Sequence, residues 1–551
     1  MNSNKKTKEP FSGIRKSNAF ILSVLIVWSL AVVYITKDIG QIIWLGNSFG
    51  FKIVALIYIA LFYLISLNVI MNVITILFVW ITGGKADIRK YIRKDKLPNC
   101  PPRVAIFYCT CNDFFKPAIE TCISQDYDNY KVFILDDSTD SGSKKSVDDF
   151  VAEHTGKVSL IRRVNKQGGK AGNLNHALAL LSKEFDYFAI IDADNLIPAD
   201  FIKKTLGYFS IDSKIGFVQA SHKGYAMSMG TLGATLASGV EIIYKNFFPV
   251  KNRYGLNAYY GHGTMIRTDV WNKVGEYPLI VAEDLSFSLA ARSAGYYGLF
   301  AEDVVCQESH PDDYKSTRRR AEKWLKGTLE FITIYFPKYI CDKKIHWFEK
   351  ADIAINAIIF IFPLPFTFLS IMIVRAVLPG LANNANYFSY ANTPDRNYLL
   401  FAIIGSLFFS IFIFNFFKRD IRKTINFLAY RIYCALSDFI ITIINIFSFL
   451  FYRKAEFLVT GDKSDTFARD RKMLCSESAP FRLLEIIFAA AFLYYGLRLK
   501  SIWLILIGVS TLLNIYITRR NRIDKYTNVL IYLIFALALL GAASLFWRPP
   551  Y

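Results

Sequence analysis

The sequence predicts an α/β domain with a parallel sheet, placed between two groups of membrane-spanning helices. Three observations predict this class: long uncharged apolar stretches towards both ends, alternating strand-like and helix-like segments between them, and carboxylates directly after the strand-like segments. The 551 residues are 53% hydrophobic, and their formal net charge is +20. Because the apolar residues are gathered in blocks, membrane and water-exposed parts can be separated along the chain.

Uncharged stretches near or above the ~20 residues needed to cross a bilayer come before and after the middle of the chain. A shorter stretch, 483–497, carries Glu485 near its start and predicts a weaker span. We therefore expect an N-terminal membrane region at 1–100, a domain at 101–337, and a C-terminal membrane region at 338–551 with about five spans. The uncharged stretches are 19–36, 53–84, 353–374, 398–417, 501–518 and 529–547.

The distribution of basic residues predicts the orientation. Five lysines and arginines lie within residues 5–16 and six within 85–96, whereas 37–52 carries two lysines and one aspartate. The positive-inside rule then places the domain at 101–337 in the cytoplasm. We expect an integral, multi-pass protein of the plasma membrane. No nucleic-acid module accounts for the positive charge, so we expect the lipid bilayer and a nucleotide as its partners, and no nucleic acid.

Strand-like and helix-like segments alternate regularly after residue 101. Such βαβ alternation predicts a parallel sheet that binds ligands at the carboxyl ends of its strands. The expected strands are 104–109, 130–135, 158–162 and 187–191, and the expected helices are 117–124, 143–154 and 171–181.

The fourth expected strand ends in Asp192-Ala193-Asp194. Residues i and i+2 of a strand face the same side, so both carboxylates can point at one place. Two like charges so close favour a cation between them, and hard oxygen ligands suit Mg²⁺ or Mn²⁺ shared with phosphates. The alternative is an ordinary turn, which also favours aspartate.

Polar side chains also follow the earlier strands. Thr110, Asn112 and Asp113 end the first strand, and Asp136 and Asp137 end the second. These groups could bond a nucleobase and a ribose, although the same residues are common in turns. A glycine-rich run with Lys170 then enters a helix, which suits a phosphate-bearing ligand. That run lacks the spacing of a Walker A loop.

Three later groups complete the candidate residues. His262 lies between two glycines, in a possible tight loop beside a pocket. Glu283 and Asp284 precede a helix expected at 285–294, either as N-terminal acids or as a general base. The segment 318–324 combines cations with an indole, and its alternative reading is a basic amphipathic helix on the membrane.

Taken in order, these motifs resemble the membrane-integrated inverting glycosyltransferases of family 2: cellulose, chitin and hyaluronan synthases and their relatives. The resemblance covers about 103–324 and implies a GT-A fold, a UDP-sugar donor and Mg²⁺ or Mn²⁺. Two motifs depart from the family: Q-x-x-R-W reads Arg320-Ala321-Glu322-Lys323-Trp324, and the threonine of T-E-D is Ala282. The matching segments are 109–113, 136–137, 168–175, 192–194 and 282–284.

The resemblance implies a role for each candidate. Asp192 and Asp194 would hold the metal, and Asp284 beside Glu283 would be the catalytic base. Trp324 and His262 would contact the acceptor. The nucleotide sugar would be bound by Asp192 together with Thr110, Asn112, Asp113, Asp136, Asp137, Lys170, Arg320 and Lys323.

A later segment, 455–477, resembles the gating loop of cellulose synthases, with one extra residue before its lysine. An amphipathic or re-entrant helix is expected before it, at 424–450. The loop residues concerned are Phe457, Val459, Thr460 and Lys463.

The expected function is that of a processive β-glycosyltransferase. It would add UDP-glucose or a similar hexose to a growing glycan with inversion, and move the glycan across the membrane. One alternative is addition of a single sugar to a lipid or short acceptor. Another is a transporter with a nucleotide-sensing insert, which the few charges within the spans disfavour.

Overall fold

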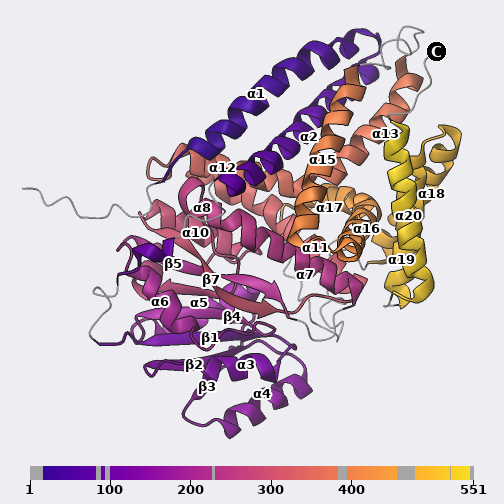
Figure 1. Ribbon diagram of the computed structural model, residues 1–551. Coiled ribbons are helices and arrows are strands. Elements are labelled where there is room, and N and C mark those ends of the chain that lie inside the picture. The colour runs from indigo at the N-terminus through magenta and orange to yellow at the C-terminus, as the bar shows by residue number, and fades with distance from the viewer. Residues whose placement is uncertain are drawn as a thin grey trace, which may run out of the picture.

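In the computed structural model, an α/β domain forms one end of the molecule, and long helices form the opposite end (Figure 1). The N-terminal helices α1 (Ala19–Ile39) and α2 (Phe49–Ile81) pack on each other, and α2 also contacts α13 (Leu364–Ala382) and α15 (Pro394–Phe416). Segments from both ends of the sequence thus form one helical group. The structure describes residues 16–81, 88–93, 100–225, 230–382, 394–455, 478–520 and 523–545.

The domain contains a seven-stranded mixed sheet with the order β3-β2-β1-β4-β6-β5-β7. The four expected strands are confirmed to within one residue at their ends, and their pairing is parallel. β6 runs antiparallel to both of its neighbours, and β7 is parallel to β5. The bounds are β1 Val104–Thr110, β2 Tyr130–Asp136, β3 Val158–Ile161, β4 Tyr187–Asp192, β5 Ile215–Gly224, β6 Thr264–Arg267 and β7 Tyr297–Glu308.

Helices cover both faces of the sheet, so its central strands are continuous apolar runs. Along β1, Ile106 packs with α3 and α6, whereas Phe107 faces the opposite way and packs with α5 and α10. This alternation is the two-residue period of a strand with a core on each side. The domain helices are α3 Lys116–Ile123, α4 Ser141–Glu153, α5 Gly169–Leu181, α6 Phe201–Phe209, α7 Thr231–Ile242, α8 Phe248–Tyr254, α9 Thr268–Val274 and α10 Glu283–Ser293.

Six helical segments in the described part of the chain are long and apolar enough to cross a membrane. The segment predicted as a weaker span belongs to one of them, α18. The predicted span 353–374 is wrong as one helix, because the chain breaks between α12 (Trp347–Ile361) and α13 at Pro363. Proline lacks the N–H that continues a helix. The six segments are Ala19–Trp44, Phe49–Ile81, Leu364–Leu381, Ala479–Arg498, Ile502–Arg520 and Lys525–Ser544.

The expected amphipathic helix at 424–450 is two helices, α16 (Ile421–Ser437) and α17 (Phe439–Tyr452), which meet at 47°. The segment predicted as a gating loop lies outside the described residues from 456 onwards. The remaining elements are α18 Ala479–Arg498, α19 Ile502–Arg520, α20 Lys525–Ser544, the short 3₁₀ helices η1 Gly40–Trp44, η2 Ile88–Tyr91 and η6 Phe336–Tyr339, and the short π helices η4 Ile243–Phe247 and η5 Phe331–Tyr335.

One helix, α11 (Tyr314–Glu330), attaches the domain to the membrane helices. It packs on α12, α17 and α19. Arg318 of α11 forms a buried ion pair of 2.9 Å with Glu485 of α18. Tyr314 bonds Ser437 of α16 at 2.5 Å through their hydroxyls. Because the same helix carries residues 320–324, these contacts also fix the basic motif.

Candidate active site

A cavity of about 1360 Å³ lies at the carboxyl ends of β1, β4 and β7. The loop before β6 and the helices α10 and α11 form its walls on the domain side. On the other side it is bounded by η4, α8 and α12, which pack against α1 or α2. Twelve of the predicted site residues line this cavity: Thr110, Asp113, Asp137, Lys170, Asp192, Asp194, His262, Glu283, Asp284, Arg320, Lys323 and Trp324.

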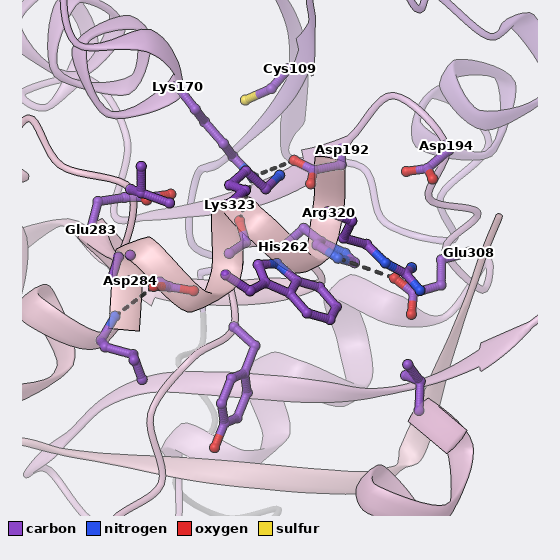
Figure 2. A pocket seen from close by; sticks show the side chains of 18 of the residues that line it. Cys109, Lys170, Asp192, Asp194, His262, Glu283, Asp284, Glu308, Arg320 and Lys323 are labelled. Atoms are coloured by element: carbon purple, nitrogen blue, oxygen red, sulfur yellow. Dashed lines mark hydrogen bonds and ion pairs between the residues drawn. The ribbon is translucent and has the colours of Figure 1, made fainter. Parts of the chain in front are cut away.

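Asp192, the last residue of β4, forms an ion pair with Lys170 from the first turn of α5 (Figure 2). The Lys170 Nζ also donates to the carbonyl oxygen of Gly261 at 2.7 Å. Burial alone would raise the pKa of Asp192, but Lys170 and His262 hold it below its ordinary value. The first carboxylate of the pair is therefore ionised and already partly neutralised.

Asp194 has the opposite electrostatic situation. Burial raises its pKa to about 7, and the negative charges of Asp192 and Glu308 add to this effect. A carboxylate with a raised pKa lacks compensation by positive charge, and it gains either a proton or a cation. The oxygens of Asp192 and Asp194 are the hard ligands that Mg²⁺ and Mn²⁺ prefer, so these residues fit such an ion.

A second carboxylate pair begins α10. Both residues line the cavity, Glu283 with 5% exposure and Asp284 half-buried, and a Cβ built on Gly261 would lie 3.6 Å from Asp284 Oδ2. Burial raises the pKa of both groups, and the charge of Asp284 adds to the rise at Glu283. Gly261 has φ +83°, a left-handed conformation that glycine adopts without strain. In the view of Figure 2, this pair lies on the opposite side from Asp194 and Glu308.

The altered basic motif on α11 faces the cavity between these two acidic groups. The Arg320 guanidinium lies 4.9 Å from the ring centre of Trp324 and donates to His310 Nδ1 at 3.1 Å. Burial lowers the pKa of Lys323, against the opposing charge of Asp192. Trp324 is 43% exposed, so its indole is open to a ligand.

Two of the predicted nucleotide-binding residues lie outside the cavity lining. Asp136 is fully buried and accepts from Arg162 Nε at 2.6 Å, so it neutralises that arginine inside the domain. The Asn112 amide bonds the backbone and side chain of Thr139 at 2.8 and 3.0 Å, which closes the loop between two strands. These polar groups stabilise the loops next to the cavity, and their roles in nucleotide binding stay predictions.

The neighbouring predicted residues keep a cavity-facing position. Asp113 accepts from the Thr110 hydroxyl at 2.9 Å, and burial raises the Asp113 pKa to about 6. Asp137 accepts two hydrogen bonds from Arg163, at 3.0 Å from Nε and 2.6 Å from Nη2. Arg163 was not predicted as part of the site, although two arginines directly after a strand are a visible signal.

The sequence reasoning also missed a group of histidines around Glu308. Ligand atoms of His222, His262 and Glu308 lie within 4.8 Å of one another, and His310 approaches Glu308 from the other side. Glu308 ends β7, a strand that the sequence reasoning did not identify. The only available signal was the run Glu308-Ser309-His310.

About half of the chain matches a known protein family. The family model described as glycosyl transferase family group 2 matches residues 187–452, from β4 to α17. The chain is also similar to a plant protein described as probable glucomannan 4-beta-mannosyltransferase 11, from Oryza sativa subsp. japonica. The two are 25% identical over 250 residues, which is 43% of this chain and 43% of the plant protein. The match therefore spans less than half of that relative.

Solved structures with similarity to the chain include the mannosyltransferase PcManGT from Pyrobaculum calidifontis, in complex with GDP-Man and Mn²⁺. Its identity is 17% over 63% of this chain and 98% of that one, with a TM-score of 0.42. TarS from S. aureus is 14% identical over 55% and 53%, with a TM-score of 0.34. Residues 187–452 of the chain thus match the family 2 glycosyltransferases, and the described part of the chain contains six helical segments long and apolar enough to cross a membrane.

Proposed function

We propose that the chain transfers a hexose from a nucleoside diphosphate sugar to an acceptor hydroxyl, with inversion at the anomeric carbon. One observation carries this proposal. A single cavity contains a carboxylate pair suited to a divalent cation and a second pair, Glu283 and Asp284, suited to accept a proton. Each pair contains a carboxylate with a raised pKa, Asp194 in the first and Asp284 in the second, as is typical of groups at a reacting centre.

The donor would occupy the side of the cavity near β1 and β4. Asp192 and Asp194 would hold Mg²⁺ or Mn²⁺, which when bound neutralises the charge of the departing diphosphate. Lys170, Arg320 and Lys323 would add positive charge there. The nucleoside would lie towards the ends of β1 and β2, where the polar side chains that line the cavity are Thr110, Asp113 and Asp137.

The acceptor hydroxyl would face Asp284. A buried carboxylate with a raised pKa is a stronger base than an exposed one, so it removes the hydroxyl proton as the oxygen attacks the anomeric carbon. Glu283 beside it would remain protonated more readily and so limit the local negative charge. Trp324 would supply an aromatic platform for a sugar ring, and His262 would lie at the boundary between donor and acceptor.

We further propose processive synthesis of a β-linked glycan, with the domain in the cytoplasm of a plasma-membrane protein and the product moved outwards. The cavity supports this because its far wall is formed by helices that pack on α1 and α2. The donor would be UDP-glucose or a similar UDP-hexose. Since the plant relative is described as a mannosyltransferase, GDP-mannose is a second donor to be tested.

A specific observation favours a second candidate, transfer of one sugar to a lipid-like acceptor. The wall formed by η4, α8 and α12 is largely apolar, and its polar side chains are paired with one another. Lys251 lies 3.2 Å from Asp352 Oδ2, and Asn356 donates to Asp352 Oδ1 at 2.7 Å. An extended glycan would find few free hydrogen-bonding partners there, whereas an alkyl chain needs none. The transporter alternative is not proposed, because the family model that matches 187–452 describes glycosyltransferases.

The test is a donor panel with product sizing. Purified full-length protein is incubated with Mn²⁺ and labelled UDP-glucose, UDP-N-acetylglucosamine or GDP-mannose, with and without added lipid. A labelled polymer supports the processive proposal, and a single-sugar lipid product supports the second candidate. Absence of turnover with every donor, in protein that is folded and monodisperse, would reject the proposed function.

A further inference from the structure

Three histidines surround the Glu308 carboxylate at the end of β7. His262 Nε2 lies 3.2 Å and His222 Nδ1 3.7 Å from Glu308 Oε2, and His310 Nε2 lies 3.4 Å from Oε1. The side chains of His222 and His310 are at most 1% exposed, and that of Glu308 is 14% exposed. Such a set could hold a transition metal, or it could be a hydrogen-bonded network around one anion.

The surroundings of His222 decide between these two readings. The side-chain oxygen of Gln219 accepts from Tyr260 N at 2.8 Å and from the Thr264 hydroxyl at 2.7 Å, which fixes the orientation of its amide. The Gln219 Nε2, a donor only, then faces His222 Nε2 at 3.2 Å. The latter nitrogen therefore carries the lone pair, and the ring proton of neutral His222 is on Nδ1, which lies 3.7 Å from Glu308 Oε2 and makes no hydrogen bond.

The position of the ring proton of His310 follows in the same way from its neighbour Arg320. Arginine can only donate, so His310 Nδ1 accepts from Arg320 Nη1, and the ring proton lies on Nε2, 3.4 Å from Glu308 Oε1 but without hydrogen-bond geometry. Two of the three rings thus have an N–H group, not a lone pair, on the nitrogen nearer to the carboxylate, at 3.7 and 3.4 Å and without hydrogen-bond geometry. A metal at this position would require those protons to leave and Gln219 to turn over. The arrangement instead fits an anion that orients three imidazoles.

We propose that Glu308 is a positioning residue for the donor diphosphate, acting through His310 on Arg320 and directly on His262. This inference rests on the proposed function, which places the diphosphate beside these two cavity-lining side chains. Glu308 itself need not contact the donor.

The proposal explains how the altered basic motif can still work. Lys323 replaces the family's arginine, and a lysine offers a single charge without a planar pair of donors. Arg320 has that planar group, but its long side chain would lose considerable rotamer freedom on binding. The chain Glu308–His310–Arg320, with Trp324 against the guanidinium, orders the group before the donor arrives. Preorganisation of this kind raises affinity by lowering the entropic cost of binding.

The carboxylate also suits this role electrostatically. Burial alone would raise the Glu308 pKa, but the His262 hydrogen bond and the three nearby imidazoles hold it well below its ordinary value. Burial alone would lower the pKa of His262, but the charge of Asp192 and the hydrogen bond and charge of Glu308 raise it. Glu308 therefore stays ionised over the physiological pH range, which keeps the network in one arrangement.

The test is a double-mutant cycle read by nucleotide binding. Full-length protein in detergent is titrated with UDP, and separately with GDP, in the presence of Mn²⁺. Glu308→Gln keeps the shape but removes the charge, and should weaken binding of the nucleotide bound by wild type about tenfold, within the range for coupled neighbours. Arg320→Ala should give a similar loss, and the double variant should add less than about twofold. The matched control is Glu276→Gln, an exposed carboxylate away from the site, which should bind as wild type does.

Other outcomes would reject either the role of Glu308 or the proposed function. Unchanged binding by Glu308→Gln, or fully additive losses in the double variant, would reject the proposal. So would a stoichiometric transition metal that Glu308→Gln loses and Asp194→Asn retains. If Glu308→Gln does not fold, His310→Gln must reproduce the loss with Glu308 intact, and normal binding would reject the role. Wild-type protein that binds neither nucleotide would reject the proposed function instead.

Discussion

Lys170 and Asp192 form an ion pair at the floor of the cavity, although they come from a helix start and a strand end 22 residues apart in the sequence. Their side chains are 10% and 34% exposed. The pair neutralises one of the two carboxylates that would hold a metal and leaves Asp194 uncompensated. The two positions of the Asp192–Asp194 motif are thus electrostatically different.

This difference makes a prediction about metal dependence. Asp194→Asn should remove the uncompensated charge that favours a cation, and Asp192→Asn should remove the carboxylate paired with Lys170. Each should lower turnover by about 10²-fold or more, because the diphosphate loses its compensating charge in a site of low dielectric constant. Turnover with Mn²⁺ or Mg²⁺, and in excess EDTA, measures the effect. Full wild-type activity in EDTA would exclude the metal site.

The base assignment makes a second prediction. Asp284→Asn keeps the shape but cannot accept a proton, so turnover should fall ~10²–10⁴-fold while nucleotide affinity is kept. The buried neighbour supplies the matched variant: Glu283→Gln should have a smaller effect, because its side chain is 5% exposed. Loss of nucleotide binding in Asp284→Asn, or a wild-type rate, would show that another group is the base.

The pH profile tests the same assignment independently. Burial raises the pKa of Asp284, and a base works only when it has lost its proton. Turnover should therefore rise with pH through a value above the ~3.9 of an ordinary aspartate, and fall as the pH drops below it. A profile with its acidic limb at or below that ordinary value would contradict a buried Asp284 base.

The sequence predicted the first half of the sheet well, for a physical reason. β1, β2 and β4 are apolar runs bounded by turn residues, and they are buried on both faces. β7 carries Glu302 and Asp303 in its middle, where its pairing with β5 shifts register, so it does not read as a buried strand. β6 has four residues and runs antiparallel, which a βαβ pattern does not predict.

The same limits apply to the site. Residues at the ends of predicted strands could be placed at one edge of the sheet. Twelve predicted site residues, from these strand ends and from later motifs, line one cavity. Glu308 could not be found, because the strand that delivers it was not identified. The pairing of Asp136 could not be predicted either, because its partner, Arg162, follows a different strand, and only the fold brings the two to 2.6 Å.

The segment resembling a gating loop makes a prediction from the sequence alone. If 455–477 closes over the donor, deletion of 459–463 or Phe457→Ala should give a folded, membrane-inserted protein with little turnover. Closure excludes water and completes a site, so its loss lowers the rate more than it affects folding. Polymer yield and UDP affinity of the deletion are measured in detergent, away from lipid. A basic loop that only touches anionic lipid would leave both values unchanged.

The last prediction concerns the ion pair between Arg318 of α11 and Glu485 of α18, which links the catalytic domain to a membrane helix. Both side chains are at most 4% exposed, and their charged atoms lie 2.9 Å apart. Arg318→Met would leave Glu485 buried without its partner, which costs about 3–5 kcal/mol. The melting temperature in detergent should fall clearly, and turnover should fall with it, because α11 also carries Arg320 and Lys323.

The double variant Arg318→Met with Glu485→Leu separates the two possible roles of this pair. Replacing a buried ion pair by apolar groups is often neutral or stabilising, so the melting temperature should recover. If turnover recovers as well, apolar packing alone holds α11 in place. If stability recovers and turnover does not, the charges fix the position of the helix. The surface control is Lys203→Met, since its pair with Asp126 is more than half exposed and should contribute little. A stable Arg318→Met single variant would contradict the view that the pair is buried and coupled.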